Sequence, residues 1–264
     1  MTKIAVLGPE YSYSHLMGMK VFPGEDLLLC DKIERVFKEI VEQKAAKGII
    51  PIENMLQGSV RESILSLLKY PVKINRAYTM PIQHCLAAQR DEYETIVSHP
   101  QALAQCSSFL ADKNVVECPS TSRAMTMAIQ DSSYAAIGSK EAAQHYGLKI
   151  LQENIEDNHD NMTRFFMISL EETIAAEKAR TSLLLKPKED RPGLLFLILA
   201  PFASQNINLL KIESLPSGRK MGEYVFYIEI DGNVHEERVE AALDFLRNSI
   251  GVYSLGSYEV MDVE

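Results

Sequence analysis

The chain has 264 residues, 46% hydrophobic and 24% charged, which suits a globular protein of one large or two smaller domains. Its formal net charge of −9 argues against a general affinity for nucleic acid or anionic membranes, so an anionic ligand needs local cations. No window approaches the ~20 apolar residues of a membrane span, and the first apolar run is too short for a signal peptide.

Short apolar runs alternate with amphipathic segments through the first 150 or so residues. Buried strands are predicted over 3–8, 26–30, 47–54, 94–100, 114–119 and 134–139. Helices are predicted over 31–46, 59–69, 101–113, 120–131 and 140–147. Asp31 is a plausible N-cap, Pro100 suits a helix start, and Gly147 suits a helix end. The alternation predicts a parallel α/β sheet.

The stretch DNHDNMTRFFMIS, at 157–169, passes from a polar loop into a buried strand, with Thr163 and Arg164 at the junction. The polar segment 171–180 then predicts a linker. Strands and helices follow in the order βαββαβ, the ferredoxin-like arrangement, in about 85 residues. Within it YVFYIEI alternates poorly, which predicts a strand that is sandwiched or paired at an interface.

Polar residues recur where the predicted strands of the first domain meet the next segment. They are Ser12 and Ser14, Glu53 and Asn54, Ser98 to Gln101, Ser120 to Ser122, Gly138 and Ser139, and Thr163 and Arg164. Singly, such residues are most often helix caps, and Glu53 and Arg164 could form a structural ion pair. Together they predict a cleft for a small anion. No motif for an activated nucleophile or a nucleotide cofactor is present.

Several of these motifs resemble those of the prephenate dehydratases, in the same order and spacing. They are PIEN at 51–54 with Gly58, SHPQALAQC at 98–106, AAIGS at 135–139 with YGL at 146–148, and NMTRF at 161–165. NINLLKIES at 206–214 resembles the ACT regulatory domain fused behind that family. The resemblance implies a two-lobed catalytic domain over 1–178, similar to the periplasmic binding proteins, and an ACT domain over 181–264. Lobe one would hold 1–77 and 159–178, and lobe two 78–158.

The resemblance implies conversion of prephenate to phenylpyruvate, in phenylalanine biosynthesis, without metal or organic cofactor. Thr163 matches the threonine regarded as essential in the family. The substrate contacts carried over are Arg164, Glu53, Asn54, Ser12, Ser98, Gln101 and Ser122. Arg164 would supply a guanidinium fork for a carboxylate. Adjacent strand residues point to opposite faces, so Arg164 is a structural partner instead if the strand has already begun.

The ACT resemblance implies feedback inhibition by phenylalanine, bound at a dimer interface, and therefore a homodimer or homotetramer. The residues that match its site are Gly193, Asn208, Leu209, Glu213 and Ser214. Leu215 stands where the family has arginine, which predicts a weaker response unless Arg219 substitutes.

Two departures lie in the catalytic motifs. Tyr11 replaces a glycine, so its loop must differ or be strained, and Met55 replaces a serine that could cap a helix or touch substrate. Three rival functions stay open: a prephenate decarboxylase, an arogenate dehydratase, and a ligand sensor without catalysis.

The cysteines and histidines show no metal-ligand spacing, and a zinc site is not expected. Cys30, Cys85, Cys106 and Cys118 are widely scattered, with no CxxC pair. Reduced thiols in a cytoplasmic protein are the expectation.

Overall fold

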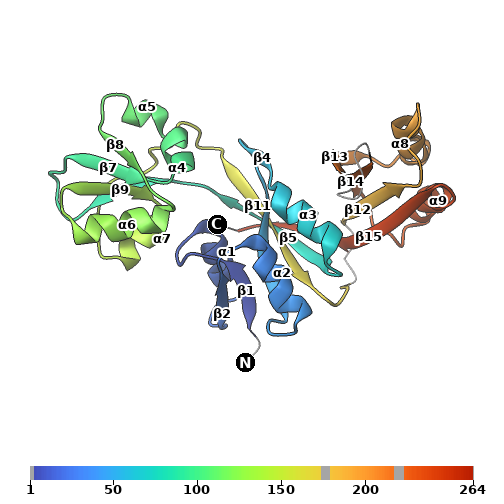
Figure 1. Cartoon of the computed structure of the whole chain (residues 1–264), viewed down its shortest axis with the longest axis horizontal. Coiled ribbons are helices and arrows are strands. Elements are labelled where there is room, and N and C mark those ends of the chain that lie inside the picture. Colours follow the sequence, from blue (N-terminus) through green and yellow to red (C-terminus); the bar gives the residue numbers. More distant parts are fainter. Residues whose placement is uncertain (1–2, 174–178, 217–222, 264) are drawn as a thin grey trace.

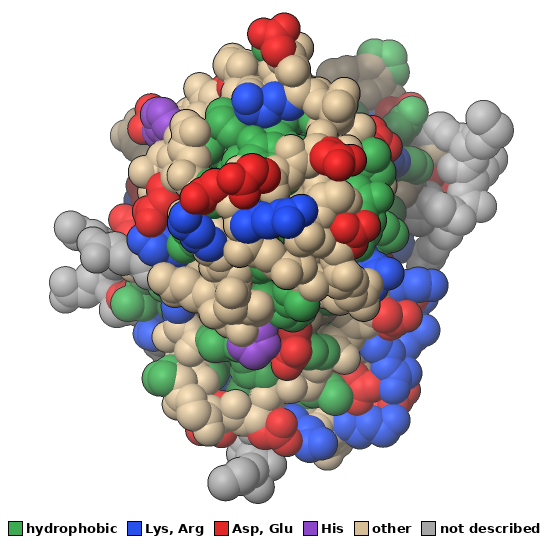
Figure 2. All heavy atoms as spheres, turned by 90° about the vertical axis from the view of Figure 1, so that its left-hand side faces the viewer, with side chains coloured by type: hydrophobic (Ala, Val, Ile, Leu, Met, Phe, Trp, Pro, Cys, Tyr) green, Lys and Arg blue, Asp and Glu red, His purple; other side chains and the backbone are tan. Residues whose placement is uncertain are grey.

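The structure, a computed structural model, describes residues 3–173, 179–216 and 223–263. Figure 1 shows lobe two at one end, lobe one in the middle and a C-terminal domain at the other end. Among the described residues, no helix has both the length and the apolar character needed to cross a membrane. The outer end of lobe two carries acidic and basic side chains interspersed over its surface (Figure 2).

Lobe one is built on a mixed sheet in the order β16-β5-β11-β3-β1-β2, with β4 paired to β3. Its strands are β1 (Ile4–Leu7), β2 (Leu27–Cys30), β3 (Lys47–Asn54), β4 (Gly58–Ser59), β5 (Lys73–Pro81), β11 (Met162–Ser169) and β16 (Val260–Asp262). Its helices are α1 (Tyr13–Val21), α2 (Ile33–Val41) and α3 (Arg61–Lys69). The predicted apolar face of α2 is buried, but Lys32 rather than Asp31 is its N-cap residue.

Lobe two has a five-stranded sheet in the order β10-β6-β9-β7-β8. Its strands are β6 (Cys85–Ala88), β7 (Thr95–Ser98), β8 (Val115–Glu117), β9 (Tyr134–Gly138) and β10 (Lys149–Gln152). Its helices are α4 (Pro100–Gln105), α5 (Ser107–Leu110), α6 (Thr121–Gln130) and α7 (Lys140–His145). The single helix predicted over 101–113 is therefore two, because the Asp157 carboxylate accepts the Ser107 and Ser108 N–H groups and starts a new helix there.

The sequence predicted a parallel sheet, but the sheets of both lobes contain parallel and antiparallel pairs. β11 runs antiparallel to both β3 and β5, because the chain leaves lobe one along β5 and returns along β11. β5 pairs with β11 as far as Pro81, so the crossing to lobe two follows residue 81 instead of residue 77. The two crossing segments are joined by the Ile82 N–H, which donates to the Asn161 carbonyl at 2.8 Å.

The C-terminal domain has the predicted βαββαβ order, with its antiparallel sheet in the order β13-β14-β12-β15. Its elements are β12 (Arg180–Pro187), α8 (Leu194–Ser204), β13 (Leu209–Pro216), β14 (Tyr224–Asp231), α9 (Glu237–Arg247) and β15 (Ile250–Tyr258). The helices pack on one face of the sheet, and the other face packs on lobe one in a shared hydrophobic core.

Strand β14 explains the poor alternation of YVFYIEI. Val225 and Tyr227 belong to the core shared with lobe one, whereas Ile228 and Ile230 belong to the core beneath α8 and α9. Both faces of the strand are thus covered, as predicted, and both need apolar side chains.

Lobe one and the C-terminal domain are also joined by backbone pairing. β16 follows the last strand of the C-terminal sheet, yet it pairs in parallel with β5 of lobe one, with Val260 opposite Ala77. The expected ACT domain over 181–264 therefore ends with a strand that belongs to the lobe-one sheet.

Candidate active site

A cleft of about 540 Å³ lies between the two lobes. Four helices point their N-termini at it, because the N-cap residues of α1, α3, α4 and α6 all line it: Ser12, Val60, His99 and Ser120. Each helix N-terminus carries partial positive charge and unpaired N–H groups, so their convergence favours an anionic ligand.

Thr163 and Asn54 form the hydrogen-bonded pair on the lobe-one wall of this cleft. They are cross-strand partners of β11 and β3, and the Asn54 amide donates to Thr163 Oγ1 at 2.9 Å. The amide orientation is fixed, because Asn54 Oδ1 accepts the Leu56 and Gln57 N–H groups, both at 3.1 Å. Since Asn54 fills a lone pair of Thr163, the hydroxyl proton of Thr163 remains available to a ligand.

A second set of polar side chains, Tyr13, His84 and Gln105, lies where lobe one meets lobe two, and none of the three was predicted as a site residue from the sequence. His84 Nε2 lies 2.8 Å from Gln105 Oε1, and Tyr13 donates its hydroxyl to the Gln83 carbonyl at 2.5 Å. Burial lowers the pKa of His84, so the ring is neutral at pH 7. Gln105 lies four residues after Gln101 on α4, which is the spacing that places both on one helix face.

Arg164 and Glu53 do not line the cleft, which corrects their assignment to the substrate. β11 begins at Met162, so Thr163 and Arg164 already point to opposite faces, and Arg164 turns toward the C-terminal domain. There it pairs with Glu229 and with Glu53. Burial opposes the charge of Arg164, but Glu229 raises its pKa above the ordinary value. No Asp, Glu, Lys or Arg side chain is among the described residues that line the cleft.

Ser98 and Ser122 likewise serve the structure instead of the cleft. Ser98 donates to the Ile137 carbonyl at 2.7 Å, which joins neighbouring strands of lobe two. Ser122 donates to the Glu10 carbonyl at 2.6 Å, a hydrogen bond that joins α6 of lobe two to lobe one. The other two predicted contacts, Ser12 and Gln101, do line the cleft.

The two departures in the motifs have different structural effects. Tyr11 has a φ of 58°, the left-handed conformation that suits glycine, and it stacks on His145 of lobe two at 4.0 Å between ring centroids. The loop is therefore strained, as expected, and it gains a contact between the lobes. Met55 is 62% exposed and does not line the cleft.

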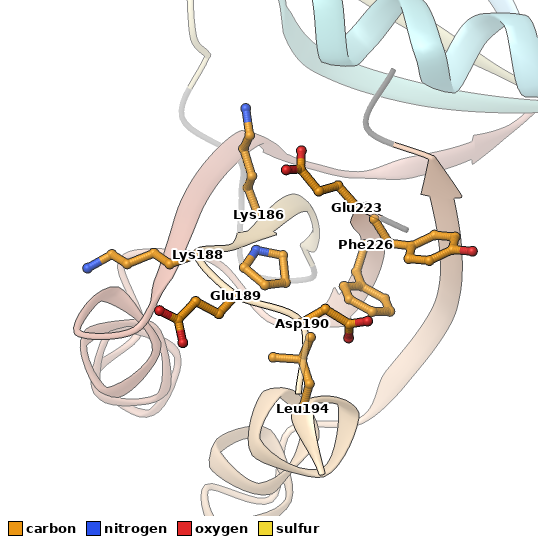
Figure 3. A pocket seen from close by; sticks show the side chains of 9 residues that line it. Lys186, Lys188, Glu189, Asp190, Leu194, Glu223 and Phe226 are labelled. Atoms are coloured by element: carbon orange, nitrogen blue, oxygen red, sulfur yellow. The ribbon is translucent and has the colours of Figure 1, made fainter. Parts of the chain in front are cut away.

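The residues predicted to bind phenylalanine lie at two places in the C-terminal domain. Gly193, with φ 82°, is the N-cap residue of α8, whereas Asn208, Leu209, Glu213 and Ser214 lie just before or on the edge strand β13. A cavity of about 370 Å³ lies near them. It is lined by Leu194, which follows Gly193, and by Phe226, the cross-strand partner of Ser214, but none of the five predicted residues is among the described residues that line it. In Figure 3, Lys186 and Glu223 extend on one side of this cavity and Leu194 lies on the opposite side.

Position 215, where leucine replaces the family's arginine, faces lobe one. Leu215 is 1% exposed and packs in the core shared by lobe one and the C-terminal domain. Arg219, its suggested substitute, lies outside the described residues. Among the described residues, no group of three His, Cys, Asp or Glu side chains lies close enough to hold a metal ion.

The sequence matches the family model of prephenate dehydratase over residues 4–173. The chain belongs to the prephenate dehydratase family. The ACT domain model matches residues 189–248, within the C-terminal domain described above.

Relatives in the prephenate dehydratase family are similar along almost the whole chain. A prephenate dehydratase of Methanocaldococcus jannaschii is 38% identical over 88% of this chain and 88% of its own. A bifunctional chorismate mutase/prephenate dehydratase of Aquifex aeolicus is 38% identical over 97% of this chain and 73% of its own. The crystal structure of a prephenate dehydratase from Arthrobacter aurescens in complex with L-Phe superposes with a TM-score of 0.88 at 29% identity, covering 98% and 90% of the two chains.

Proposed function

We propose that this chain converts prephenate into phenylpyruvate, water and carbon dioxide, and so acts as a carbon–oxygen lyase. The observation that carries the proposal is the Thr163 hydroxyl, which accepts from Asn54 and keeps its own proton for a ligand in the cleft. Membership of the prephenate dehydratase family indicates which reaction takes place. The Asn54–Thr163 hydrogen bond indicates which side chain assists the leaving group.

The reaction needs help for a poor leaving group. The bond between the ring and its carboxylate breaks, its electron pair moves into the ring, and the carbon–oxygen bond breaks with its pair on the departing oxygen. Thr163 donates a hydrogen bond to that oxygen as negative charge develops on it, while aromatisation of the ring drives the step. The former ring carboxylate leaves as carbon dioxide, and the departing hydroxide takes a proton from solvent and leaves as water.

Prephenate carries two carboxylates. The described residues that line the cleft include no lysine or arginine, so neutral donors must hold these carboxylates. The four convergent helix N-termini supply N–H groups and partial positive charge, each worth about 0.3–1 kcal/mol at an exposed site. Gln101 and the hydroxyls of Ser12 and Ser120 lie beside them. His99 accepts the Gln101 N–H with Nδ1 at 3.2 Å, which leaves Nε2 as the ring nitrogen that can donate to a ligand.

The test is to incubate the purified protein with prephenate near neutral pH and to identify the product by mass and absorbance. A sample without protein is needed, since prephenate dehydrates spontaneously in acid. Thr163→Ala should lower kcat by roughly 10²–10³, the loss typical of one oxyanion donor, and Thr163→Ser should retain part of the activity. Thr126→Ala, which removes a hydroxyl bonded within α6, is the matched control.

The identity of the product separates the rival functions. A decarboxylated product that keeps its ring hydroxyl would indicate a prephenate decarboxylase. Faster turnover of arogenate than of prephenate would indicate an arogenate dehydratase. Saturable prephenate binding without turnover would indicate a sensor. Near-full activity of Thr163→Ala would refute the role given to Thr163.

We further propose that L-phenylalanine inhibits the enzyme by binding between two copies of the C-terminal domain in a homodimer or homotetramer. The support is a cavity lined by Leu194, which follows Gly193, and by Phe226, the cross-strand partner of Ser214, together with exposed apolar side chains on α8 and β13. Phe196 on α8 is 72% exposed, and Ile212 on the edge strand β13 is 42% exposed. Light scattering with and without phenylalanine tests the assembly, and a flat activity curve at millimolar phenylalanine would contradict the inhibition.

We also propose a cytoplasmic location. All four cysteines are unpaired and buried, the state that a reducing compartment maintains. Fractionation of cells that express the chain tests it, and recovery from a secreted fraction would contradict it.

A further inference from the structure

Four charged side chains meet where lobe one faces the C-terminal domain. Arg164 donates from Nη1 and Nη2 to the two oxygens of Glu229, at 2.7 and 2.8 Å, and from Nη2 to Glu53 at 2.8 Å. Lys211 donates from Nζ to the other oxygen of Glu53 at 2.7 Å. We call Glu53, Arg164, Lys211 and Glu229 the domain-bridging network. Two residues come from lobe one and two from the C-terminal sheet.

The network is buried at its centre and more open at one end. The side chains of Arg164 and Glu229 are 9% and 1% exposed, whereas that of Glu53 is 35% exposed. Tyr227 donates to Glu229 at 2.6 Å, so the buried carboxylate has partners besides the guanidinium. Arg164 Nε is buried without a hydrogen-bond partner, so the guanidinium is held through Nη1 and Nη2 alone. Buried charges paired in this way hold a fixed geometry, because each displacement leaves a charge without its partner.

The network lies on the opposite face of the lobe-one sheet from the Thr163–Asn54 pair. Arg164 follows Thr163 on β11 and Glu53 precedes Asn54 on β3, and the two pairs are successive cross-strand partners. The register shifts immediately afterwards, because Phe165 pairs with Pro51 and the extra residue Ile52 forms a bulge. Alternation along the strands places one pair in the cleft and the other against the C-terminal domain.

We propose that Glu229 and Lys211 are positioning residues for the Thr163–Asn54 pair, so that the C-terminal domain sets the geometry of the catalytic hydroxyl. The regulatory part of this inference rests on the proposed phenylalanine site. Lys211 lies on β13, the strand that carries Leu209, Glu213 and Ser214. A ligand that shifts β13 moves Lys211 away from Glu53. Glu53 then changes position, and Asn54, the next residue of β3, moves with it.

Lys211→Met is the decisive variant, because it leaves Arg164 paired with both carboxylates and removes only the cation on β13. Lys149→Met is the matched control, since it removes an exposed ion pair with Asp91 in lobe two. With prephenate, we expect kcat of Lys211→Met to fall about tenfold, KM to change less than twofold, and Lys211→Arg to recover most of the loss. L-Phenylalanine should bind Lys211→Met with an unchanged Kd by calorimetry but inhibit it about tenfold less effectively.

A readout independent of turnover is hydrogen exchange in the peptide over residues 161–165. It should accelerate in Lys211→Met and not in Lys149→Met. Glu229→Gln should accelerate exchange in the same peptide more strongly. If Glu229→Gln fails to fold, the result for Lys211→Met is sufficient to test the inference. Wild-type exchange, kcat and inhibition in both variants would overturn the inference. Lack of prephenate turnover or of phenylalanine binding in the wild type would refute the proposed function instead, and the exchange rates would still decide the positioning role.

Discussion

Thr163 and Arg164 are consecutive residues of β11 whose side chains lie on opposite sides of the lobe-one sheet. Thr163 accepts a hydrogen bond from Asn54 in the cleft, and Arg164 pairs with Glu229 of the C-terminal domain. Two adjacent residues of one motif therefore lie in separate places, one in the cleft and one at the domain boundary, and the proposed mechanism uses only Thr163. A substitution at Arg164 and one at Thr163 should accordingly produce different defects.

Asn54→Asp tests the direction of the hydrogen bond to Thr163. An ionised carboxylate has no proton to donate, so it would accept the Thr163 proton that the proposed mechanism requires. We expect kcat with prephenate to fall on the order of 10²-fold with the fold intact. Asn114→Asp, a surface amide of lobe two, is the control. Activity within twofold of wild type would show that Thr163 does not depend on a donor at position 54.

Gly256→Ala tests the docking of the C-terminal sheet on lobe one. Gly256 has a φ of 135°, and a Cβ there would overlap the Ile74 carbonyl of β5. We expect a loss of about 1–3 kcal/mol or more in unfolding free energy. Gly24→Ala is the control, because its φ of 80° is also left-handed but a Cβ meets no neighbour within 4 Å. Urea unfolding measures both, and equal losses would show that the close approach to β5 is unimportant.

Stability should decline as the pH falls below the ordinary histidine pKa of 6.5. Burial lowers the pKa of His84 and of His15 in the folded protein, so below 6.5 the unfolded chain binds protons that the folded protein does not. The unfolding free energy should therefore fall with decreasing pH until the folded pKa values are reached, and be unaffected by these groups above 6.5. Urea midpoints on either side of that pH check this, and His84→Gln should flatten the slope.

The cysteines should resist thiol reagents in the folded protein. Burial raises the pKa of Cys30 to about 11 and that of Cys85 and Cys106 to about 12, so almost no thiolate exists at neutral pH. We expect slow modification of the native protein and rapid modification of four thiols in denaturant. A single fast-reacting thiol in the native protein would contradict this and would point to local opening around it.

Local patterns predicted much of the fold because they are set by nearby residues. The apolar face of α2 and the βαββαβ order of the C-terminal domain appear in the structure as the spacing indicates. The place of Thr163 at the mouth of a buried strand followed from the change of polarity around it. The resemblance to the prephenate dehydratases was confirmed by the family match over 4–173.

Features that depend on distant residues could not be predicted in the same way. Arg164 has two carboxylate partners. The ion pair with Glu53 was offered by the sequence, but Glu229 lies 65 residues later, in another domain, and nothing near the TRF motif indicates it. His84 lies between two strands that the apolar pattern did not reveal, β5 and β6. Gln105 had a usable signal, since it shares a helix face with Gln101. Ser98 and Ser122 were misassigned because a hydroxyl near a cleft serves equally well as an internal hydrogen-bond donor.

The pairing of β16 with β5 has a consequence for how the chain folds as it is synthesised. Until residues 260–262 emerge, the outer edge of β5 has no strand beside it, although every other strand of that sheet has already been made. An uncovered strand edge invites pairing with other chains. The nascent protein therefore carries an aggregation-prone edge from the end of β11 at Ser169 to the start of β16 at Val260, through the synthesis of about 90 further residues. Ribosome-bound chains stopped before β16 should associate more readily than the finished protein, and they should need chaperones to stay apart.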